Sequence, residues 1–257
     1  MHIVITGASS GIGAAYARHF AAEGHKLTLV ARRRDLLVAL AAELPTETLV
    51  VAQDLGDLES STTFLGAAED ALGPIDVLVN NAGVQVVGPF AQTSSEDGEQ
   101  CIRVDLLAPL RLTRAVLPSM IRRKTGVIVD VASMAALAPT PGMAYYNAAK
   151  GGLAAASEGL RAELRPLGVH VVTVYPGIIA STAMAQAAMT KYGSSSVMNL
   201  TPRGTEEVLA KLTLSAITGR HDRVIYPRSG ALARWFPATT RWLMDRFTPP
   251  LRGEAHD

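Results

Sequence analysis

The sequence is poor in cysteine and in net charge, and each shortage excludes a class of protein. Cys101 is the only cysteine among 257 residues, which excludes an internal disulfide and a metal site made of several cysteines. A formal net charge of +1 gives no indication of nucleic acid as a partner. The N-terminal stretch MHIVITGAS lacks the basic flank and the long apolar core of a signal peptide. We therefore expect a soluble protein of the reducing cytoplasm.

Charged residues are also missing from residues 166–190, a length that could cross a membrane. Gly168, Pro176 and Gly177 interrupt this stretch, and polar side chains such as His170 occur within it. A buried strand followed by a loop explains the pattern better than a membrane span does.

What is present is a regular alternation of short β-branched runs with longer segments at helical spacing. The expected strands are 3–6, 26–31, 48–53, 77–80, 127–131, 169–175 and 224–226. The expected helices are 12–23, 33–44, 58–72, 102–124, 146–167 and 205–218. Several strands are almost entirely apolar, as strands covered by helices on both faces are. This order predicts a Rossmann-like, doubly wound parallel sheet in one domain over residues 1–257.

A glycine-rich turn follows the first expected strand, with Gly7, Gly11 and Gly13 before a helix. Glycines here allow a pyrophosphate to approach backbone N–H groups at the start of the helix. Three glycines in a turn are weak evidence alone, and a connection without a ligand would look the same. Their place between the first strand and the first helix favours a dinucleotide site.

The second expected strand ends in Ala31 and is followed by Arg32, Arg33 and Arg34. NAD sites usually carry an acidic residue at this point, whereas arginine suits the 2′-phosphate of NADP. The alternative is a solvated basic start of a helix, which applies most to Arg33 and Arg34. We expect NADP(H) as the preferred cofactor, with NAD(H) possible.

Tyr146 and Lys150 lie four residues apart, so they share one face of the expected helix. Such a pair arises often by chance and would then be surface decoration. Ser133 strengthens the case because it follows a buried strand at the same edge of the parallel sheet as the glycine turn. Ligands bind at the carboxyl ends of such strands.

Over about residues 1–227, the chain resembles the short-chain dehydrogenase/reductase family. The motifs that carry the resemblance occur in the family's order and spacing: Thr6-Gly7-x3-Gly11-x-Gly13, Asn80-Asn81-Ala82-Gly83, Ser133, Tyr146-x3-Lys150 and Pro176-Gly177. The resemblance implies an oxidoreductase that moves hydride between a nicotinamide cofactor and a ketone or alcohol. It also implies a homodimer or homotetramer.

The resemblance assigns a role to each catalytic residue. Tyr146 would be the general acid or base, Lys150 would lower the pKa of its phenol, and Ser133 would orient the substrate oxygen. Contacts with the cofactor are implied at Gly7, Ser9, Ser10, Gly11, Ile12, Gly13, Arg32, Arg33, Asp54, Leu55, Asn81, Ala82, Gly83, Tyr146, Lys150, Pro176, Gly177 and Ile179.

Two positions need separate treatment. Tyr145 is five residues before Lys150 and therefore off its helical face, so we expect it in a wall of the substrate pocket. Asp105 stands where the family usually has an asparagine that helps to hold a water of the proton relay. Its carboxylate could pair with Lys150 and alter that relay, or it could be a harmless near-isostere.

The substrate side is expected to be apolar. The loops after Ser133 and after Gly83 carry almost no charge, which favours a lipophilic ketone or alcohol. A mobile lid is expected at about residues 178–203, centred on 184–199. The tail, at about residues 228–257, mixes aromatic residues with arginines, and Pro237 excludes a single long helix. We expect it to pack on the pocket or on another subunit, although contact with a membrane surface stays open.

Two other functions compete with this interpretation. An epimerase or dehydratase on the same fold would keep the glycine turn and Tyr146-x3-Lys150 but is usually longer. A catalytically impaired dinucleotide-binding or sensing protein would be expected to lack tyrosine, lysine or serine, and only Asp105 favours it.

Overall fold

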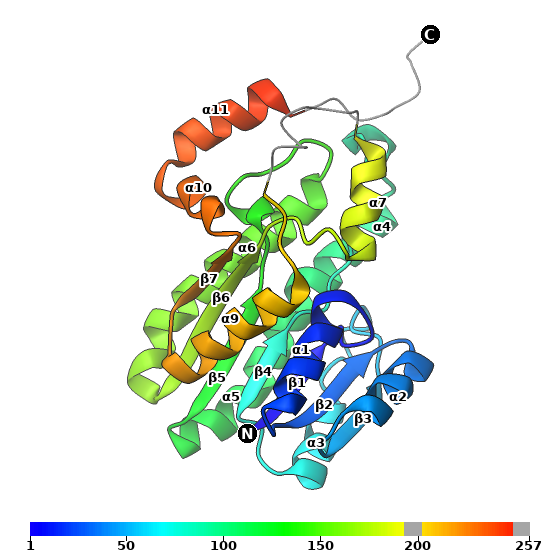
Figure 1. Ribbon diagram of the computed structural model, residues 1–257, viewed down its shortest axis with the longest axis vertical. Helices are drawn as coiled ribbons and strands as arrows, with labels where there is room; N and C mark the ends of the chain where they lie inside the picture. Colours follow the sequence, from blue (N-terminus) through cyan, green and yellow to red (C-terminus); the bar gives the residue numbers. More distant parts are fainter. Residues whose placement is uncertain (193–201, 249–257) are drawn as a thin grey trace.

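The computed structural model describes residues 1–192 and 202–248, and its centre is a seven-stranded sheet (Figure 1). The strand order is β3-β2-β1-β4-β5-β6-β7, and every neighbouring pair is parallel. The strands are β1 (His2–Thr6), β2 (Lys26–Ala31), β3 (Thr48–Ala52), β4 (Val77–Asn80), β5 (Gly126–Val131), β6 (Val169–Pro176) and β7 (Arg223–Tyr226). The doubly wound parallel sheet predicted from the sequence is confirmed.

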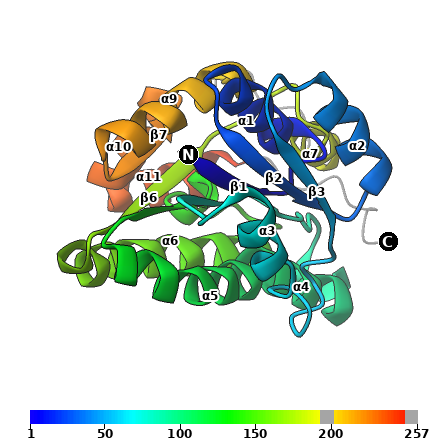
Figure 2. The same ribbon diagram turned by 90° about the horizontal axis from the view of Figure 1, so that it is seen from below.

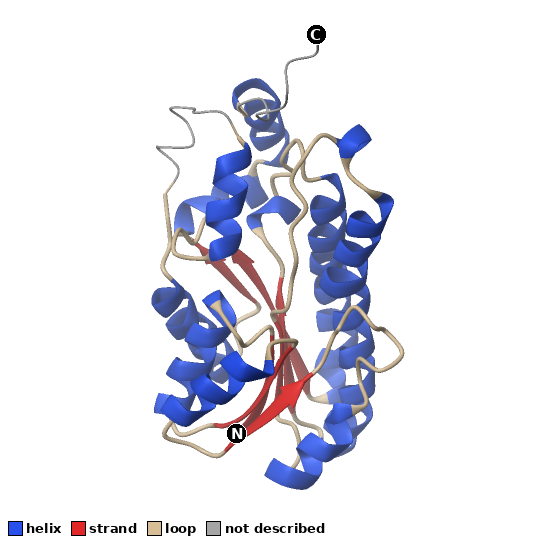
Figure 3. Cartoon of the chain, turned by 90° about the vertical axis from the view of Figure 1, so that its right-hand side faces the viewer, coloured by secondary structure: helices blue, strands red, loops and turns tan. Residues whose placement is uncertain are grey.

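Helices lie on both faces of the sheet (Figures 2 and 3). One face carries α1 (Gly11–Ala22), α2 (Arg34–Glu43) and α9 (Glu206–Gly219). The other carries α3 (Phe64–Leu72), α5 (Ala108–Arg123) and α6 (Ala144–Leu164). This explains why the strands are apolar on both sides: Ile3 and Ile5 of β1 pack into the first layer and Val4 into the second.

The topology itself selects one edge of the sheet for a ligand. β1 lies between β2 and β4, so the chain order reverses at the β1–β4 pair. Ligands of open α/β sheets bind outside the carboxyl ends of the strands at such a point. The glycine turn follows β1 and the turn of residues 80–83 follows β4, so both lie at this edge.

Two helices differ from the sequence prediction. α3 begins at Phe64 rather than at residue 58, because the Asp57 side chain accepts bonds from Ser60 and from the Glu59 N–H and stabilises turns instead. The long central helix begins earlier than residue 102, as α4 (Ser95–Ile102), with Ser94 as its N-cap. It passes through a π-helical stretch, η2 (Arg103–Leu107), before α5.

The C-terminal part contains helices that the sequence did not indicate. α7 (Ala183–Lys191) replaces the expected loop after β6, and residues 193–201 of the expected lid lie outside the described residues. The tail forms α10 (Ala231–Trp235) and α11 (Pro237–Phe247), divided at Pro237 as predicted, and residues 249–257 also lie outside. Within the described ranges, no helix combines the length and apolarity needed to cross a bilayer.

Candidate active site

The glycine turn between β1 and α1 holds backbone that only glycine fits. Gly7 and Gly11 have φ of 68° and 54°, in the left-handed region. A Cβ on Gly7 would lie 2.7 Å from the Ala82 Cα, and one on Gly13 would lie 2.3 Å from the Gly7 O. Gly13 is therefore buried behind the turn, where it allows close packing. It is not among the residues that line the cleft described below, and its predicted contact with the cofactor stays a prediction.

A second turn, after β4, is joined to the first through Thr6. The Thr6 hydroxyl accepts from the backbone N–H groups of Asn81 and Ala82, at 2.9 and 3.0 Å. The Asn81 side-chain amide donates to the Thr6 O at 2.9 Å. The ends of β1 and β4 are thus held together, and a helix N-terminus with free N–H groups points into the space above them.

Arginine borders the same space at the end of β2. Arg33 Nη2 donates to the hydroxyls of Ser9 and Ser10, each at 3.0 Å, which places a guanidinium directly over the glycine turn. Arg32 and Arg33 both line the cleft. Arg34 does not line it and instead opens α2, with Arg33 as the N-cap residue, so the alternative of a solvated helix start applies most to Arg34.

Tyr146 and Lys150 project from α6 into the cleft, as their spacing predicts. Both are buried, and the Lys150 Nζ lies 6.0 Å from the centroid of the Tyr146 ring. Ser133 follows β5 on the facing wall, where its hydroxyl accepts from the Ala135 N–H at 3.1 Å. Three residues from two elements therefore meet at the carboxyl edge of the sheet.

Tyr145 does not line the cleft, so the expectation that it forms a wall of the pocket is wrong. Its ring covers Gly98 of α4, where an added Cβ would lie 2.3 Å from the ring. It also packs against Phe90, with 5.5 Å between the ring centroids. One residue along a helix turns the side chain by about 100°, and that rotation separates Tyr145 from Tyr146.

Asp105 lies behind Lys150 and forms a buried ion pair with it. Its Oδ2 is 3.3 Å from the Lys150 Nζ, and its Oδ1 accepts from the Val84 N–H at 2.7 Å. Lys150 also donates to the Val131 O at 2.9 Å. Gly83 leaves room for the pair, because a Cβ there would lie 2.9 Å from Asp105 Oδ2. Asp105 does not line the cleft, so it acts on the site through its contact with Lys150 and through the field of its charge at Tyr146.

Burial and the ion pair act in opposite directions on these charges. Burial lowers the pKa of Lys150, but the Asp105 carboxylate and the Tyr146 phenol outweigh it, and the pKa is raised above its ordinary value. Burial raises the pKa of Asp105 above its ordinary value. Lys150 and the Val84 N–H lower this pKa but do not outweigh burial. Lys150 is therefore held as an ammonium.

Burial also raises the pKa of the Tyr146 phenol, and Asp105 adds to the rise. Lys150 and the Ser133 hydroxyl lower it but do not overcome burial. From the sequence, Lys150 was expected to lower the pKa of Tyr146. In the protein without cofactor, the cost of burying the phenolate outweighs the stabilising effect of the Lys150 ammonium. Burial likewise raises the pKa of the neighbouring Cys101 thiol to about 12, so this thiol stays neutral.

The glycine turn, the arginines after β2 and the Ser133, Tyr146 and Lys150 side chains border one cleft of about 1110 Å³. Of the residues predicted to bind cofactor or substrate, it brings together Gly7, Ser9, Ser10, Gly11, Ile12, Arg32, Arg33, Asp54, Leu55, Asn81, Ala82, Gly83, Ser133, Tyr146, Lys150, Pro176, Gly177 and Ile179. Sequence reasoning missed Ser181, Thr182 and Glu206, which also line it. Thr182 caps α7 and Ser181 donates to the buried Glu206; the Ser/Thr pair before an Ala-rich run was the available signal.

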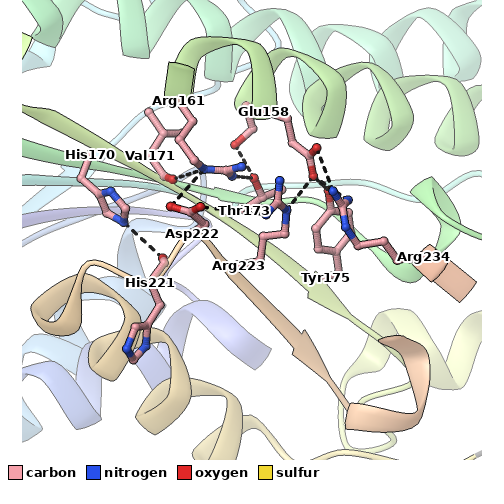
Figure 4. Close-up of polar contacts among 11 residues, drawn as sticks. Glu158, Arg161, His170, Val171, Thr173, Tyr175, His221, Asp222, Arg223 and Arg234 are labelled. Carbon is pink, nitrogen blue, oxygen red and sulfur yellow. Dashed lines mark hydrogen bonds and ion pairs between the residues drawn. The ribbon is translucent and has the colours of Figure 1, made fainter. Parts of the chain in front are cut away.

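A polar cluster between α6 and strands β6 and β7 fixes the C-terminal wall of the cleft (Figure 4). Glu158 accepts from Tyr175, from Arg223 of β7 and from both terminal nitrogens of Arg234 of α10. Burial raises the pKa of Glu158, but these hydrogen bonds outweigh it and lower the pKa to about 2. α10 is thus attached to the sheet, and α11, which follows it, supplies Leu243, Met244 and Phe247 to the cleft.

Comparison with known proteins gives consistent matches. A family model described as short chain dehydrogenase matches residues 1–193. A short chain dehydrogenase of Pseudocercospora fijiensis is 36% identical over 184 residues, which are 69% of this chain and 59% of that protein, so the chain spans less than two thirds of that relative. A very-long-chain 3-oxoacyl-CoA reductase of Phaeosphaeria nodorum is 32% identical over 253 residues, 95% of this chain and 71% of that protein.

The fold is also similar to solved structures. A short-chain dehydrogenase from Sphingobium yanoikuyae, in complex with NADPH, has a TM-score of 0.79 and 34% identity to this chain. The match covers 100% of this chain and 98% of that one.

Proposed function

The chain belongs to the short-chain dehydrogenase family, and on that premise we propose that it uses NADP(H) to reduce a ketone, or oxidise the matching secondary alcohol, on a lipophilic small molecule. The observation that carries the proposal is the meeting of Tyr146, Lys150 and Ser133 on the wall of a cleft that also contains the glycine turn. The chain is an enzyme acting on alcohol and carbonyl groups, and Tyr146 is its proton donor.

The cleft fits NADP(H) on the evidence of its own residues. The N–H groups at the start of α1 suit the pyrophosphate, and Gly7 lets the turn before α1 pack closely against Ala82. Arg32 and Arg33 suit the 2′-phosphate, because a planar guanidinium binds phosphate oxygens in pairs. The bound nicotinamide supplies the hydride. The relative from Sphingobium yanoikuyae was crystallised with NADPH, which supports the same cofactor here.

The protein's part in the chemistry is to hold the carbonyl and to move one proton. The Ser133 hydroxyl donates to the substrate oxygen and positions it beside Tyr146. The Tyr146 phenol then gives its proton to that oxygen. A pKa raised by burial keeps this phenol protonated, which is the form that reduction requires. Lys150, held as an ammonium, stabilises the phenolate that remains.

The walls of the substrate side support a lipophilic substrate. Val84, Ala135, Met143 and Met189 line the cleft beyond Tyr146. The relative from Phaeosphaeria nodorum is named a very-long-chain 3-oxoacyl-CoA reductase, which agrees with an apolar substrate chain. A homodimer or homotetramer, in the cytoplasm, is the assembly and location that we propose from the family alone.

The test is NADPH oxidation with a panel of ketones, run beside Tyr146→Phe. A positioned general acid contributes about 10²–10⁴-fold, so the variant should lose about that factor in kcat while it binds NADPH normally. Tyr145→Phe is the matched control and should stay active, because its ring lies outside the cleft. NADPH binding without turnover of any ketone would favour the alternative, a dinucleotide-binding or sensing protein that has lost catalysis.

A further inference from the structure

The cleft extends beyond the reacting residues, between two helices that the family motifs do not include. On one side, α7 contributes Met184, Ala185, Ala188 and Met189 to the lining. On the other, α11 contributes Leu243, Met244 and Phe247. We call this part the α7–α11 groove; both helices lie in the upper part of Figure 1, beyond the carboxyl ends of the strands.

The side chains of the groove are apolar and flexible rather than rigid. Among the described residues, five methionines line the cleft as a whole: Met134, Met143, Met184, Met189 and Met244. Methionine is unbranched and adapts to the shape of what it contacts. A wall of this kind suits a flexible chain that takes several conformations better than it suits a rigid ring of fixed shape.

Charge is concentrated at the opposite end of the cleft. Among the lining residues that the structure describes, the cations are Arg32 and Arg33, above the glycine turn, and Lys150, which pairs with Asp105. No described lining residue of α7 or α11 is charged. A substrate with a carboxylate or phosphate in the groove would find no cationic partner among these described side chains, whereas an alkyl chain loses no hydrogen bond there.

The α11 wall is also unusually open to water. Leu243 and Phe247 line the cleft, yet each is 44% exposed. The wall is nevertheless fixed: Arg234 attaches α10 to Glu158, and Arg241 donates to the Pro139 O at 3.2 Å. This apolar surface is held in place but exposed to water. Covering it with an alkyl chain is therefore favourable, and little is lost in ordering the wall.

We propose that the non-reacting part of the substrate is a long, unbranched alkyl chain, which lies in the α7–α11 groove while its carbonyl is at Tyr146. Leu243 and Phe247 then determine the preference for chain length. The inference rests on the proposed function, because it places the reacting carbonyl at Tyr146. The inference adds a substrate class and two specificity residues to the proposed function.

The test uses the full chain and a series of methyl ketones from hexan-2-one to undecan-2-one. Each methylene that leaves water for the groove should raise kcat/KM by about three- to fourfold, until the groove is filled. The gain should come from KM with kcat unchanged, since the chain is bound equally in the ground and transition states. Isothermal titration of the same ketones into the protein with NADP⁺ should give the same factor in Kd without turnover.

Variants assign the effect to the groove. Leu243→Ala combined with Phe247→Ala should lower kcat/KM for undecan-2-one by about tenfold and leave hexan-2-one unchanged, as expected for lost contacts with about two methylenes. Trp235→Ala is the matched control: Trp235 of α10 is 74% exposed but does not line the cleft. It should leave the chain-length series unchanged, and melting temperatures should show that all variants fold.

Each possible result either supports or overturns the inference about the α7–α11 groove. Turnover that does not depend on chain length, a preference for ketones with two bulky groups, or the same loss in Trp235→Ala would overturn the inference and leave the proposed function standing. A chain-length dependence of Kd without turnover of any ketone would support the groove and overturn the proposed function instead.

Discussion

Replacement of Asp105 by Asn removes one buried charge from behind Lys150. Two effects on titration are expected. Asp105 raises the pKa of the Tyr146 phenol, so its loss should lower that pKa. Asp105 also opposes the effect of burial on Lys150, so its loss should lower the pKa of the ammonium. Both pKa values should therefore move down in the variant.

Distances in the structure bound the effect of Asp105 on the pKa of Tyr146. The Lys150 Nζ is 6.0 Å from the Tyr146 ring centroid, and two unit charges at that distance interact by about 3 kcal/mol at an effective dielectric of about 20. Asp105 lies behind Lys150, and its effect on Tyr146 is the smaller of the two. We therefore expect the loss of Asp105 to lower the pKa of Tyr146 by less than the loss of Lys150 would raise it.

Hydrogen bonding adds a cost in stability. Asp105 faces two donors, the Val84 N–H and the Lys150 ammonium, and a carboxylate can accept from both. An asparagine has only one acceptor oxygen, so one of these donors stays without its partner. The free energy of unfolding should fall by about 1–3 kcal/mol, the usual cost of one unsatisfied buried group.

The assay is kcat/KM for alcohol oxidation from about pH 6 to about pH 10 in both proteins. Oxidation requires the Tyr146 phenolate, so the rising limb should move to lower pH in Asp105→Asn, and a falling limb should enter at high pH as Lys150 loses its proton. Glu206→Gln, which alters a buried carboxyl bonded to Ser181, is the control and should leave the profile in place. Superimposable profiles would refute the electrostatic reasoning, and lost activity without a shift would point to a relay that needs the carboxylate.

Three further predictions follow from named contacts. Arg32→Ala with Arg33→Ala should weaken NADPH by about 2 kcal/mol or more and NADH far less, and equal wild-type affinities for the two cofactors would refute the phosphate site. Gly83→Ala should lower kcat, because its Cβ would lie 2.9 Å from Asp105 Oδ2; Gly66→Ala, with nothing within 4 Å, should stay active. Glu158→Gln should lower Tm at neutral pH. The wild type should lose this stabilisation as the pH falls from about 4.5 toward about 2, and a thermal-melt series that gives parallel curves would contradict this.

The sheet and the core of the site were predictable because their signals are local. Apolar runs such as those of β5 and β6 identify buried strands, and the ends of parallel strands must share one edge. Glycine spacing and the separation of Tyr146 from Lys150 then place the reacting groups. Asp105 beside Lys150 was open to prediction for the same reason, although its pairing was only one of two interpretations.

Contacts between distant segments were not predictable from the sequence. Gly13 shares the pattern of Gly7, but whether it faces the cleft or the Gly7 O depends on how α1 packs on the strands. Tyr145 is placed by Gly98, which is 47 positions earlier in the chain and lies in a helix that the apolar pattern did not indicate. The position of α11 on the wall of the cleft depends on the hydrogen bond between Arg234 and Glu158, which lie 76 residues apart in the sequence.

The central claim is that Tyr146 gives the proton that completes carbonyl reduction. Single-turnover reduction of a long-chain methyl ketone by NADPH, compared between the wild type, Tyr146→Phe and Tyr145→Phe, tests it most directly. We predict that Tyr146→Phe binds NADPH normally but reduces the ketone about 10²–10⁴-fold more slowly, while Tyr145→Phe keeps the wild-type rate. A Tyr146→Phe variant that reduces the ketone at the wild-type rate, or an inactive Tyr145→Phe, would contradict the account.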